Sequence, residues 1–371
     1  MGLHALTEAD LAAVARATPD LASLAVRVGD RLTTYQLVPG DGIAADESAE
    51  TDADVVVAMS ADAWGDLTTQ MRTIISLFLA NELTLERGEF LQLMDWGPLL
   101  TRIFNDVPLY DPTRVDLSGV DLTRTFTLDD SDADMRSYLE TTGYLHVRGV
   151  FSAAEIAALN AEVDRLAAQA TRGDDESWWV TDEDGNDALC RLVYAGLRSE
   201  LINDTEFDAR VARLGTLLRD DLKPSHDRME GVAVLLKVPG KTQGLSNIPW
   251  HQDCGMGGHA IFCPSVGVGI QLTGSNAETG NITFVPGSHG QSLNAAWRQN
   301  PDVPVVAVDT EPGDVTVHIK DVMHASPEPT GEGWRRTMYV SHYPPSLWDH
   351  VGAGQAFNDL VRNRTEEVAS L

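Results

Sequence analysis

The chain has few cysteines and few basic residues. Cys190, Cys254 and Cys263 are its only cysteines, and so few widely spaced thiols suit a reducing compartment without a disulfide framework. There are 27 Lys and Arg against 56 Asp and Glu, which gives a formal net charge of -29. Nucleic acids and anionic membrane surfaces attract cationic proteins, so this charge argues against both as partners.

Long apolar runs are also missing. Ile74–Ala80 is among the longest, and it is far shorter than the roughly 20 residues that a membrane-spanning helix needs. The first residues carry charges throughout and lack the apolar centre of a secretory signal, so a cytoplasmic location is expected. With 371 residues, 43% of them hydrophobic, the chain can form two or three domains with sizeable cores.

Composition and periodicity predict a smaller N-terminal α/β domain over residues 1–112 and a polar, acidic linker over residues 113–134. No cluster of His, Cys or paired carboxylates occurs in the N-terminal domain. A polar stretch, Gly40–Asp54, is expected to form a hairpin tip or a loop. Apolar patterns predict the other elements of this domain: strands at Leu24–Val28, Thr33–Val38 and Asp54–Met59, a helix at Leu67–Ala80, and a closing strand-to-helix segment, LTLERGEFLQLMDWGPLLTRIF.

Residues 135–371 form the second predicted domain. It begins with an expected strand at Tyr144–Val150, and a helix should follow because Ser152 and Glu155 have the spacing of a capping box. A mixed helical region is expected up to about Lys223. Short strands with Gly, Pro and Asn turns then predict an antiparallel barrel or sandwich.

The sequence PWHQDCG contains the first candidate metal ligands. If it forms a strand, His251 and Asp253 point to the same side. His324, 71 residues after Asp253, could supply a third ligand from a distant strand. Two His and one carboxylate on one face leave further coordination positions open, as in non-haem Fe(II) oxygenases, whereas zinc more often takes a closed tetrahedral set or three His.

Arg335 lies 11 residues beyond His324 in the segment GWRRTMYVSHY. Alternation along a strand would place Arg335, Thr337 and Tyr339 on one face and Arg336 on the other. A buried guanidinium needs an anionic partner, and its planar fork suits a carboxylate, to which Thr337 could add a hydroxyl. At most one of the two adjacent arginines can therefore enter a pocket.

Five motifs in this order make the second domain resemble the phytanoyl-CoA dioxygenase family: GYLHVRGVFSAAEI, WHQD, ETGNITFVPGSH, PGDVTVHIKDVMHASP and GWRRTMYVSHY. The resemblance implies an α+β protein whose catalytic domain is a double-stranded β-helix, or jelly-roll, flanked by helices. It also implies Fe(II), the cosubstrate 2-oxoglutarate and O2. By position, it makes His251, Asp253 and His324 the metal ligands and catalytic centre, with Arg335 on the distal carboxylate of 2-oxoglutarate and Ser326 nearby.

One position departs from the family pattern. Family members often have an aromatic residue on the strand before the Gly–Asn turn, where this chain has VGVGIQLTGSN with Gly269 and Gln271 on the corresponding face. Gln271 could contact the cosubstrate or be a structural polar residue. Lys237 is a further candidate for binding its carboxylate.

Substrate contacts are expected in the helical insert of the second domain, from Trp179 and Arg191, although core packing is the alternative. Asp253 favours a hydroxylase over a halogenase, because related halogenases have a small residue in place of the carboxylate ligand. The expected partner is a small organic molecule that the sequence does not identify, and the oligomeric state is not indicated either.

The N-terminal domain resembles sterol-carrier-protein-like domains, which implies a lipid-type pocket or a docking module. The predicted function of the whole chain is hydroxylation, or another oxidation, of an unactivated C–H bond, with release of succinate and CO2. The alternative is a non-catalytic, metal-binding jelly-roll that acts with a lipid-carrier-like domain as a small-molecule binding protein.

Overall fold

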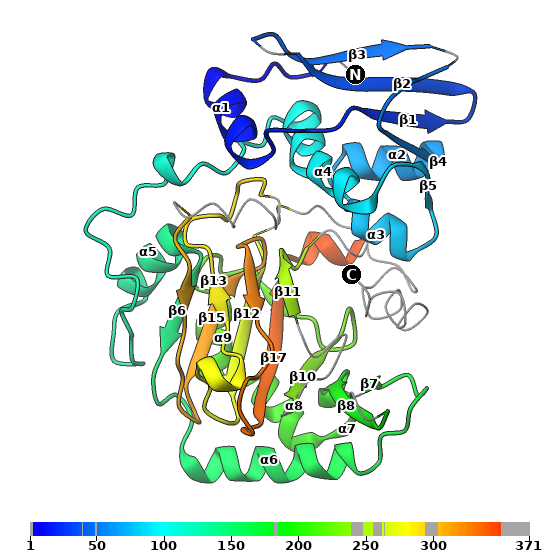
Figure 1. Cartoon of the computed structure of the whole chain (residues 1–371). Helices are drawn as coiled ribbons and strands as arrows, with labels where there is room; N and C mark the ends of the chain where they lie inside the picture. Colours follow the sequence, from blue (N-terminus) through cyan, green and yellow to red (C-terminus); the bar gives the residue numbers. More distant parts are fainter. Residues whose placement is uncertain are drawn as a thin grey trace. The chain divides into compact units, whose positions relative to one another are not determined.

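The computed structural model describes residues 3–38, 40–48, 50–181, 185–238, 248–254, 262, 264–293 and 303–349 (Figure 1). Contacts between Cα atoms separate the chain into two compact units. The first is built mainly of residues up to Asp116, and the second mainly of residues from Leu117 onward. This division falls inside the segment 113–134 that the sequence suggested as a linker.

The first unit combines helices with one five-stranded sheet of order β3-β2-β1-β4-β5. Strands β1 and β4 are parallel, and the other neighbours are antiparallel. Tyr35, Trp64 and Phe104 pack as an aromatic cluster in its core. The elements are α1 (Glu8–Ala17), β1 (Leu24–Val28), β2 (Arg31–Val38), β3 (Gly42–Glu47), β4 (Val55–Met59), α2 (Ala61–Thr68), α3 (Ile74–Leu79), β5 (Leu83–Arg87) and α4 (Phe90–Asn105).

The predicted strands of the first unit are confirmed as β1, β2 and β4, but one expectation was wrong and another only partly right. The single helix expected at Leu67–Ala80 is broken, because Gln70 has a left-handed backbone (φ 64°) and Thr73 caps a new helix, α3. The hairpin tip expected in the polar stretch Gly40–Asp54 is present, because Gly40 and Asp41 lie in the turn between β2 and β3, but the stretch also contains the strand β3 itself. The likeness to sterol-carrier-like domains stays a prediction.

The second unit contains two antiparallel sheets. The larger has the order β6-β15-β12-β17-β10-β8-β7, with β9 beside β17, and the smaller has the order β11-β16-β13-β14. Its strands are β6 (Tyr144–Val147), β7 (Ser177–Thr181), β8 (Asp187–Leu192), β9 (Lys223–Pro224), β10 (Val232–Lys237), β11 (Ile248–His251), β12 (Val266–Gln271), β13 (Thr283–Phe284), β14 (Val306–Ala307), β15 (Val315–Ile319), β16 (His324–Ser326) and β17 (Arg335–Tyr343).

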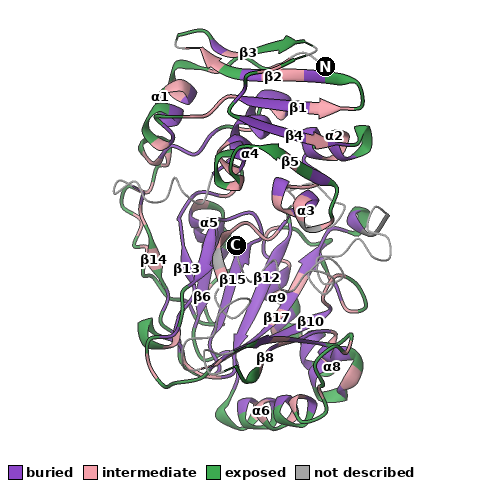
Figure 2. Cartoon of the chain, turned by 45° about the vertical axis from the view of Figure 1, so that its right-hand side comes forward, coloured by how far each residue is buried: buried purple, intermediate pink, exposed green. Residues whose placement is uncertain are grey.

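The two sheets face each other, which is the arrangement of the predicted jelly-roll. The ring of His318 on β15 of the larger sheet lies 4.7 Å from the ring of His324 on β16 of the smaller one. Tyr144 on β6 stacks on Phe284 on β13, with ring centroids 4.6 Å apart. In Figure 2 these strands are almost entirely buried.

Helices cover the outer face of the larger sheet, where the side chains are mainly apolar. Val268, Val317 and Met338 are buried there in one hydrophobic core, while the inner face carries polar side chains. The helices of the unit are α5 (Asp132–Thr142), α6 (Ala153–Ala167), α7 (Ala195–Arg198), α8 (Glu200–Glu206) and α9 (Ala209–Gly215), with short 3-10 turns at Ala277–Thr279 and Pro345–Asp349. A further 3-10 turn, Pro112–Arg114, belongs to the first unit. The polar side chains that could bind a ligand therefore line the space between the two sheets.

Helix α6 begins where the sequence predicted. The Ser152 hydroxyl accepts a hydrogen bond from the Glu155 backbone N–H, and the Glu155 carboxylate accepts one from the backbone N–H of Ser152.

Strand β6 is shorter than expected, because it ends at Val147, two residues before Gly149 takes a positive φ of 60°. Within the segment 113–134, Phe126 is buried and pairs with β6 through two backbone hydrogen bonds.

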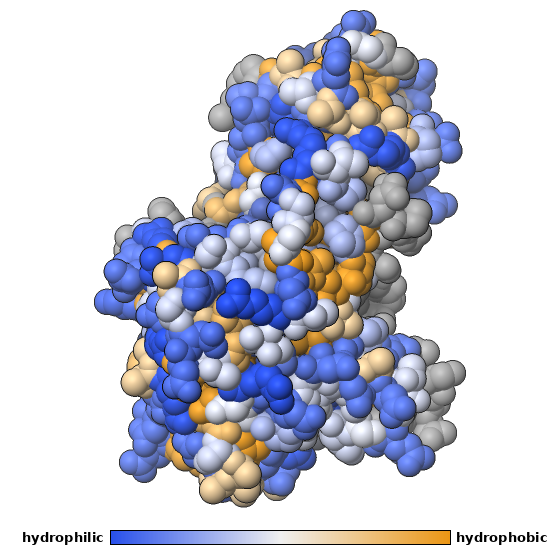
Figure 3. Space-filling model, turned by 90° about the vertical axis from the view of Figure 1, so that its left-hand side faces the viewer, coloured by the Kyte–Doolittle hydropathy of each residue, from blue (hydrophilic) through white to orange (hydrophobic). Residues whose placement is uncertain are grey.

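Within the described residues, every helix is too short or too polar to cross a bilayer. Hydrophilic side chains cover most of the face shown in Figure 3, with smaller apolar areas between them.

Candidate metal and cosubstrate site

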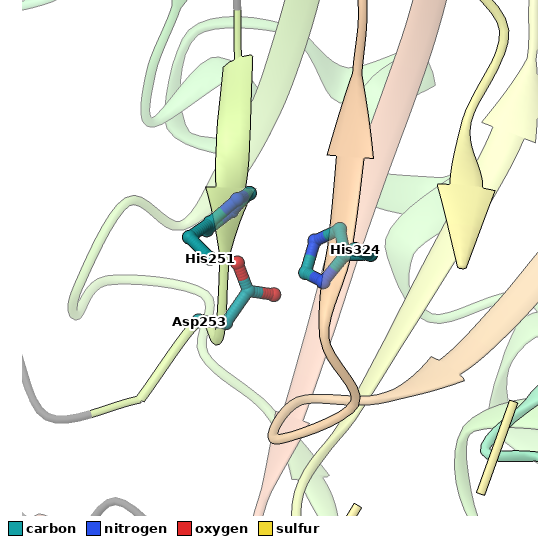
Figure 4. A group of neighbouring side chains, drawn as sticks. All are labelled: His251, Asp253 and His324. Carbon is teal, nitrogen blue, oxygen red and sulfur yellow. The ribbon is translucent and has the colours of Figure 1, made fainter. Parts of the chain in front are cut away.

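Three candidate ligands come together on the smaller sheet. His251 ends β11 and lies opposite His324, the first residue of the neighbouring strand β16. Their ring centroids are 4.3 Å apart. One nitrogen of each imidazole and one carboxylate oxygen of Asp253 all lie within 4.8 Å of one another (Figure 4). Two imidazoles and a carboxylate converging from one side are donors that fit Fe(II) and leave its other positions open.

Asp253 reaches this cluster by a different route from the one expected. Strand alternation was wrong as the reason, because β11 stops at His251 and Asp253 lies in the bend that follows. Between the two ligands, the Gln252 side-chain amide donates a hydrogen bond of 2.6 Å to the Asp321 carbonyl oxygen. Because Asp321 lies three residues before His324, this bond ties the two ligand-bearing segments together.

A hydrogen bond sets which nitrogen of His324 can bind a metal. Its Nδ1 lies 2.9 Å from the carbonyl oxygen of Val322. A carbonyl oxygen can only accept, so Nδ1 carries the proton and Nε2 is left as the ligand atom. Such a bond to the second ring nitrogen is the usual support of a metal-binding histidine.

Two cations lie next to the triad, on the inner face of the larger sheet. Lys237 on β10 is directly opposite Arg335 on β17, and both side chains are fully buried. None of the described carboxylates forms an ion pair with either cation. Like charges placed opposite each other on neighbouring strands repel, and a buried charge without a partner is unfavourable. The pair therefore fits an anionic ligand between the sheets.

The pKa values of both cations respond to this burial. Burial and, to a smaller extent, the Arg335 charge lower the pKa of Lys237 to about 6, and Glu328 opposes the shift. Burial also lowers the pKa of Arg335. An anion bound between the two cations would favour their charged forms.

Ser326 lies beside Arg335, and its predicted place near the cosubstrate stays a prediction. Arg335 Nη1 donates hydrogen bonds to the Ser326 hydroxyl (2.6 Å) and to the Gly280 carbonyl oxygen (2.7 Å). The Lys237 amine donates to the carbonyl oxygens of Ser326 (2.6 Å) and Pro327. Arg335 Nε is buried and has no hydrogen-bond partner among the described residues. One edge of the guanidinium is thus held by the protein, and its Nε edge is available to a ligand.

Gln271 and Thr337 bind each other beneath this site. The Thr337 hydroxyl donates to Gln271 Oε1 (3.1 Å), and Gln271 Nε2 donates to the Gly269 carbonyl oxygen and the Thr316 hydroxyl. Of the two interpretations of Gln271, these bonds favour the structural one. The Thr337 hydroxyl is engaged in the same way, so the predicted contact of either residue with the cosubstrate stays a prediction.

Trp179 and Arg191 belong to a hairpin, so the expected helical insert was wrong at this point. Arg191 lies on β8 opposite Leu235, whose side chain shares the inner face with Lys237, and it forms a 2.7 Å ion pair with Glu230. Its guanidinium also lies 4.6 Å from the ring centre of Trp178 on β7. The pairing of the two strands has one extra residue, Cys190, on β8. Trp178 packs with Val180 and Cys190, whereas the Trp179 indole N–H donates to the Ser177 hydroxyl (2.8 Å), so the two indoles lie on opposite sides of the hairpin.

Gly280 and Tyr339 contact Arg335 but were not among the candidate site residues. Gly280 has a φ of 70°, and a Cβ there would lie 2.9 Å from the Lys237 amine and closer still to the Pro327 carbonyl oxygen. Only glycine suits this position. The motif ETGNITF contained Gly280, but its role needs the distant contact with β17. Alternation had already placed Tyr339 on the face of Arg335.

Comparisons with known proteins agree with this site. The family model of phytanoyl-CoA dioxygenase matches residues 139–337, more than half of the chain. No curated protein matches closely enough to count as a relative.

Several solved structures are similar to part of this chain. AviO1 from Streptomyces viridochromogenes Tue57 is 24% identical over 58% of this chain and 96% of its own, with a TM-score of 0.48. The α-ketoglutarate-dependent epimerase SnoN from nogalamycin biosynthesis is 24% identical over 57% of this chain and 83% of its own, with a TM-score of 0.46. EctD from S. alaskensis with bound Fe is 18% identical over 67% of this chain and 86% of its own, with a TM-score of 0.49.

The identities and TM-scores are low, so the assignment rests on the family model. That model begins within α5 and ends at Thr337, the third residue of β17, so it includes the metal cluster and Arg335. The predicted cofactors, Fe(II) and 2-oxoglutarate, agree with the family and with the donor set of the cluster. By this match across both sheets and the candidate site, the chain belongs to the phytanoyl-CoA dioxygenase family.

Proposed function

We propose that the chain is an Fe(II)- and 2-oxoglutarate-dependent dioxygenase that oxidises an unactivated C–H bond of a small organic substrate and releases succinate and CO2. One observation carries this proposal: a two-His, one-carboxylate cluster faces a buried pair of cations on the opposite sheet. A simple metal-binding protein has no need of the cations. A dioxygenase that uses a dicarboxylate cosubstrate needs both.

The roles of the residues follow from their positions. His251, Asp253 and His324 would hold the iron, which supplies the O2 and redox chemistry when it is bound. Arg335 would bind the distal carboxylate of 2-oxoglutarate through its Nε edge, which the protein leaves available. Lys237 would add a second positive charge to the same carboxylate. Ser326 and Gly280 hold the guanidinium in place for this contact.

The carboxylate of Asp253 supports oxygenation over halogenation as the outcome. In the halogenating relatives a small residue replaces this ligand and leaves room for halide, whereas here a carboxylate points into the cluster. Within oxygenation, hydroxylation is the reaction that we propose.

The substrate would approach from the hairpin side of the sheet. Arg191 lies on the inner side of β8, at the end of the row that includes Leu235 and Lys237, and its guanidinium lies over the Trp178 indole. Trp179, the other predicted substrate contact, is the next residue on β7. An indole and a guanidinium suit a substrate with a flat apolar part and a polar group. We propose a cytoplasmic location for this activity, as the sequence predicts.

The test is an anaerobic titration of the full-length protein with Fe(II) and 2-oxoglutarate, followed by visible absorption. The native protein should give a weak absorption band that saturates with 2-oxoglutarate, and His251→Ala should not. The alternative, a non-catalytic binding protein, predicts metal binding without a band that depends on 2-oxoglutarate. Absence of the band in the native protein, or an undiminished band in the variant, would rule out the proposal.

A further inference from the structure

We infer that Tyr339 is a second cosubstrate contact, whose hydroxyl donates a hydrogen bond to the distal carboxylate held by Arg335. This inference rests on the proposed function and extends it to a residue on the strand next to β12. The family's usual aromatic residue is missing from β12 itself. A tyrosine from β17 takes over its place beside the cosubstrate.

The first support comes from two glycines on β12. Gly269 lies directly opposite Tyr339 in the strand register, and its φ is outside the left-handed region. The backbone therefore does not require glycine there. A Cβ on Gly269 would lie 2.8 Å from Cε1 of Tyr339, because the tyrosine ring leans across the strand at this point. Gly267 makes the same kind of room for the ring of His318. The missing side chain on β12 thus leaves the space that the Tyr339 ring occupies.

The second support is the position of the tyrosine hydroxyl at the ligand edge of Arg335. Arg335 Nη2 donates to the Tyr339 hydroxyl over 3.4 Å, while Nη1 is turned to Gly280 and Ser326. A carboxylate on the Nε and Nη2 edge would therefore lie next to this hydroxyl. Tyr339 is only partly buried, so its ring borders the interior space.

The third support is an account of the hydroxyl protons around Arg335. The Ser326 hydroxyl donates to the Gly280 carbonyl oxygen (2.8 Å), and the Thr337 hydroxyl donates to Gln271. Tyr339 accepts from Arg335, and its own proton has no acceptor among the described residues. Of these three hydroxyls, only that of Tyr339 can donate to an incoming carboxylate without breaking an existing bond.

The experiment compares two ligands that differ only at the distal end. The first is 2-oxoglutarate, and the second is 2-oxopentanoate, which has a methyl group in place of the distal carboxylate. Their dissociation constants are measured by calorimetry on full-length protein loaded with Fe(II) without oxygen. Tyr339→Phe should weaken 2-oxoglutarate about tenfold, as expected for a lost hydrogen bond to a charged group, and leave 2-oxopentanoate unchanged.

Tyr138→Phe is the matched control. Tyr138 lies on α5, and the substitution removes a hydroxyl that donates to the carbonyl oxygen of Asp121, so it should change neither affinity. If Tyr339→Phe binds 2-oxoglutarate as tightly as the native protein does, or weakens both ligands equally, the inference is wrong. If the native protein itself does not bind 2-oxoglutarate, the proposed function fails instead.

Discussion

Lys237 and Arg335 are two basic side chains that lie opposite each other inside the second unit. Arg335 was predictable at the residue level, because its distance from His324 and its alternation with Arg336 indicated which arginine points inward. Lys237 was a weaker candidate, because nothing in the sequence near LLKVPG shows that β10 pairs with β17. Their pairing across two strands is a property of the folded chain, and it identifies the anion site more clearly than either motif does.

Proton uptake on cosubstrate binding tests this pair. With a pKa of about 6, Lys237 is mostly uncharged at pH 7.5 before ligand binds, and a neighbouring carboxylate raises that pKa. Binding of 2-oxoglutarate at this pH should therefore take up a proton, and the affinity should fall as the pH rises above 6. Calorimetry in phosphate and in Tris, on protein already loaded with Fe(II), measures the uptake.

Lys237→Met is the control for this titration. It keeps the length of the side chain and removes the amine, so its binding enthalpy should be the same in both buffers. Equal enthalpies in the native protein would show instead that Lys237 does not change its charge on binding.

Elements with local signals could be predicted, and those that depend on distant partners could not. Ser152 and Glu155 marked the start of α6, because a capping box is a local pattern. The hairpin of β7 and β8 was missed, since its pairing with β10 involves residues about 40 positions away. Asp253 shows a mixed result: its convergence with His251 was predicted, but a bend rather than a strand produces it.

The cap of α6 allows a stability test at this scale. Ser152→Ala removes the hydroxyl that accepts from the Glu155 backbone N–H, so it should lower the free energy of unfolding by about 1 kcal/mol. Denaturant unfolding followed by circular dichroism measures the change. Ser137→Ala, at an exposed position inside α5, is the same substitution without a cap, and it should have little effect or stabilise slightly. Equal effects of the two substitutions would contradict the role of the cap.

The acidic composition concerns the molecule as a whole. The chain has a formal net charge of -29, although we propose that its site binds a dianion. The sequence could predict this charge and the two-unit organisation, because both follow from composition along the chain. It could not show that the two antiparallel sheets place Lys237 and Arg335 across from the metal cluster, since that requires the full strand order.

Ionic strength should reveal the effect of this charge. The protein repels 2-oxoglutarate at long range, and added salt screens that repulsion. The association rate constant of 2-oxoglutarate, measured by anaerobic stopped-flow absorption, should therefore rise between low salt and about 0.15 M KCl. The control is 2-oxopentanoate, which carries one negative charge fewer, so its association rate constant should change less with salt. A rate that falls with salt would show that the buried cations dominate the approach.

The hydrogen bond from Gln252 to the Asp321 carbonyl oxygen has a consequence for metal exchange. It holds the segments of His251, Asp253 and His324 in register by protein contacts alone. The chelate is then preorganised, and little conformational entropy is lost when a metal enters. Unlike a zinc finger, which folds around its ion, this protein should release and regain its iron with its fold intact.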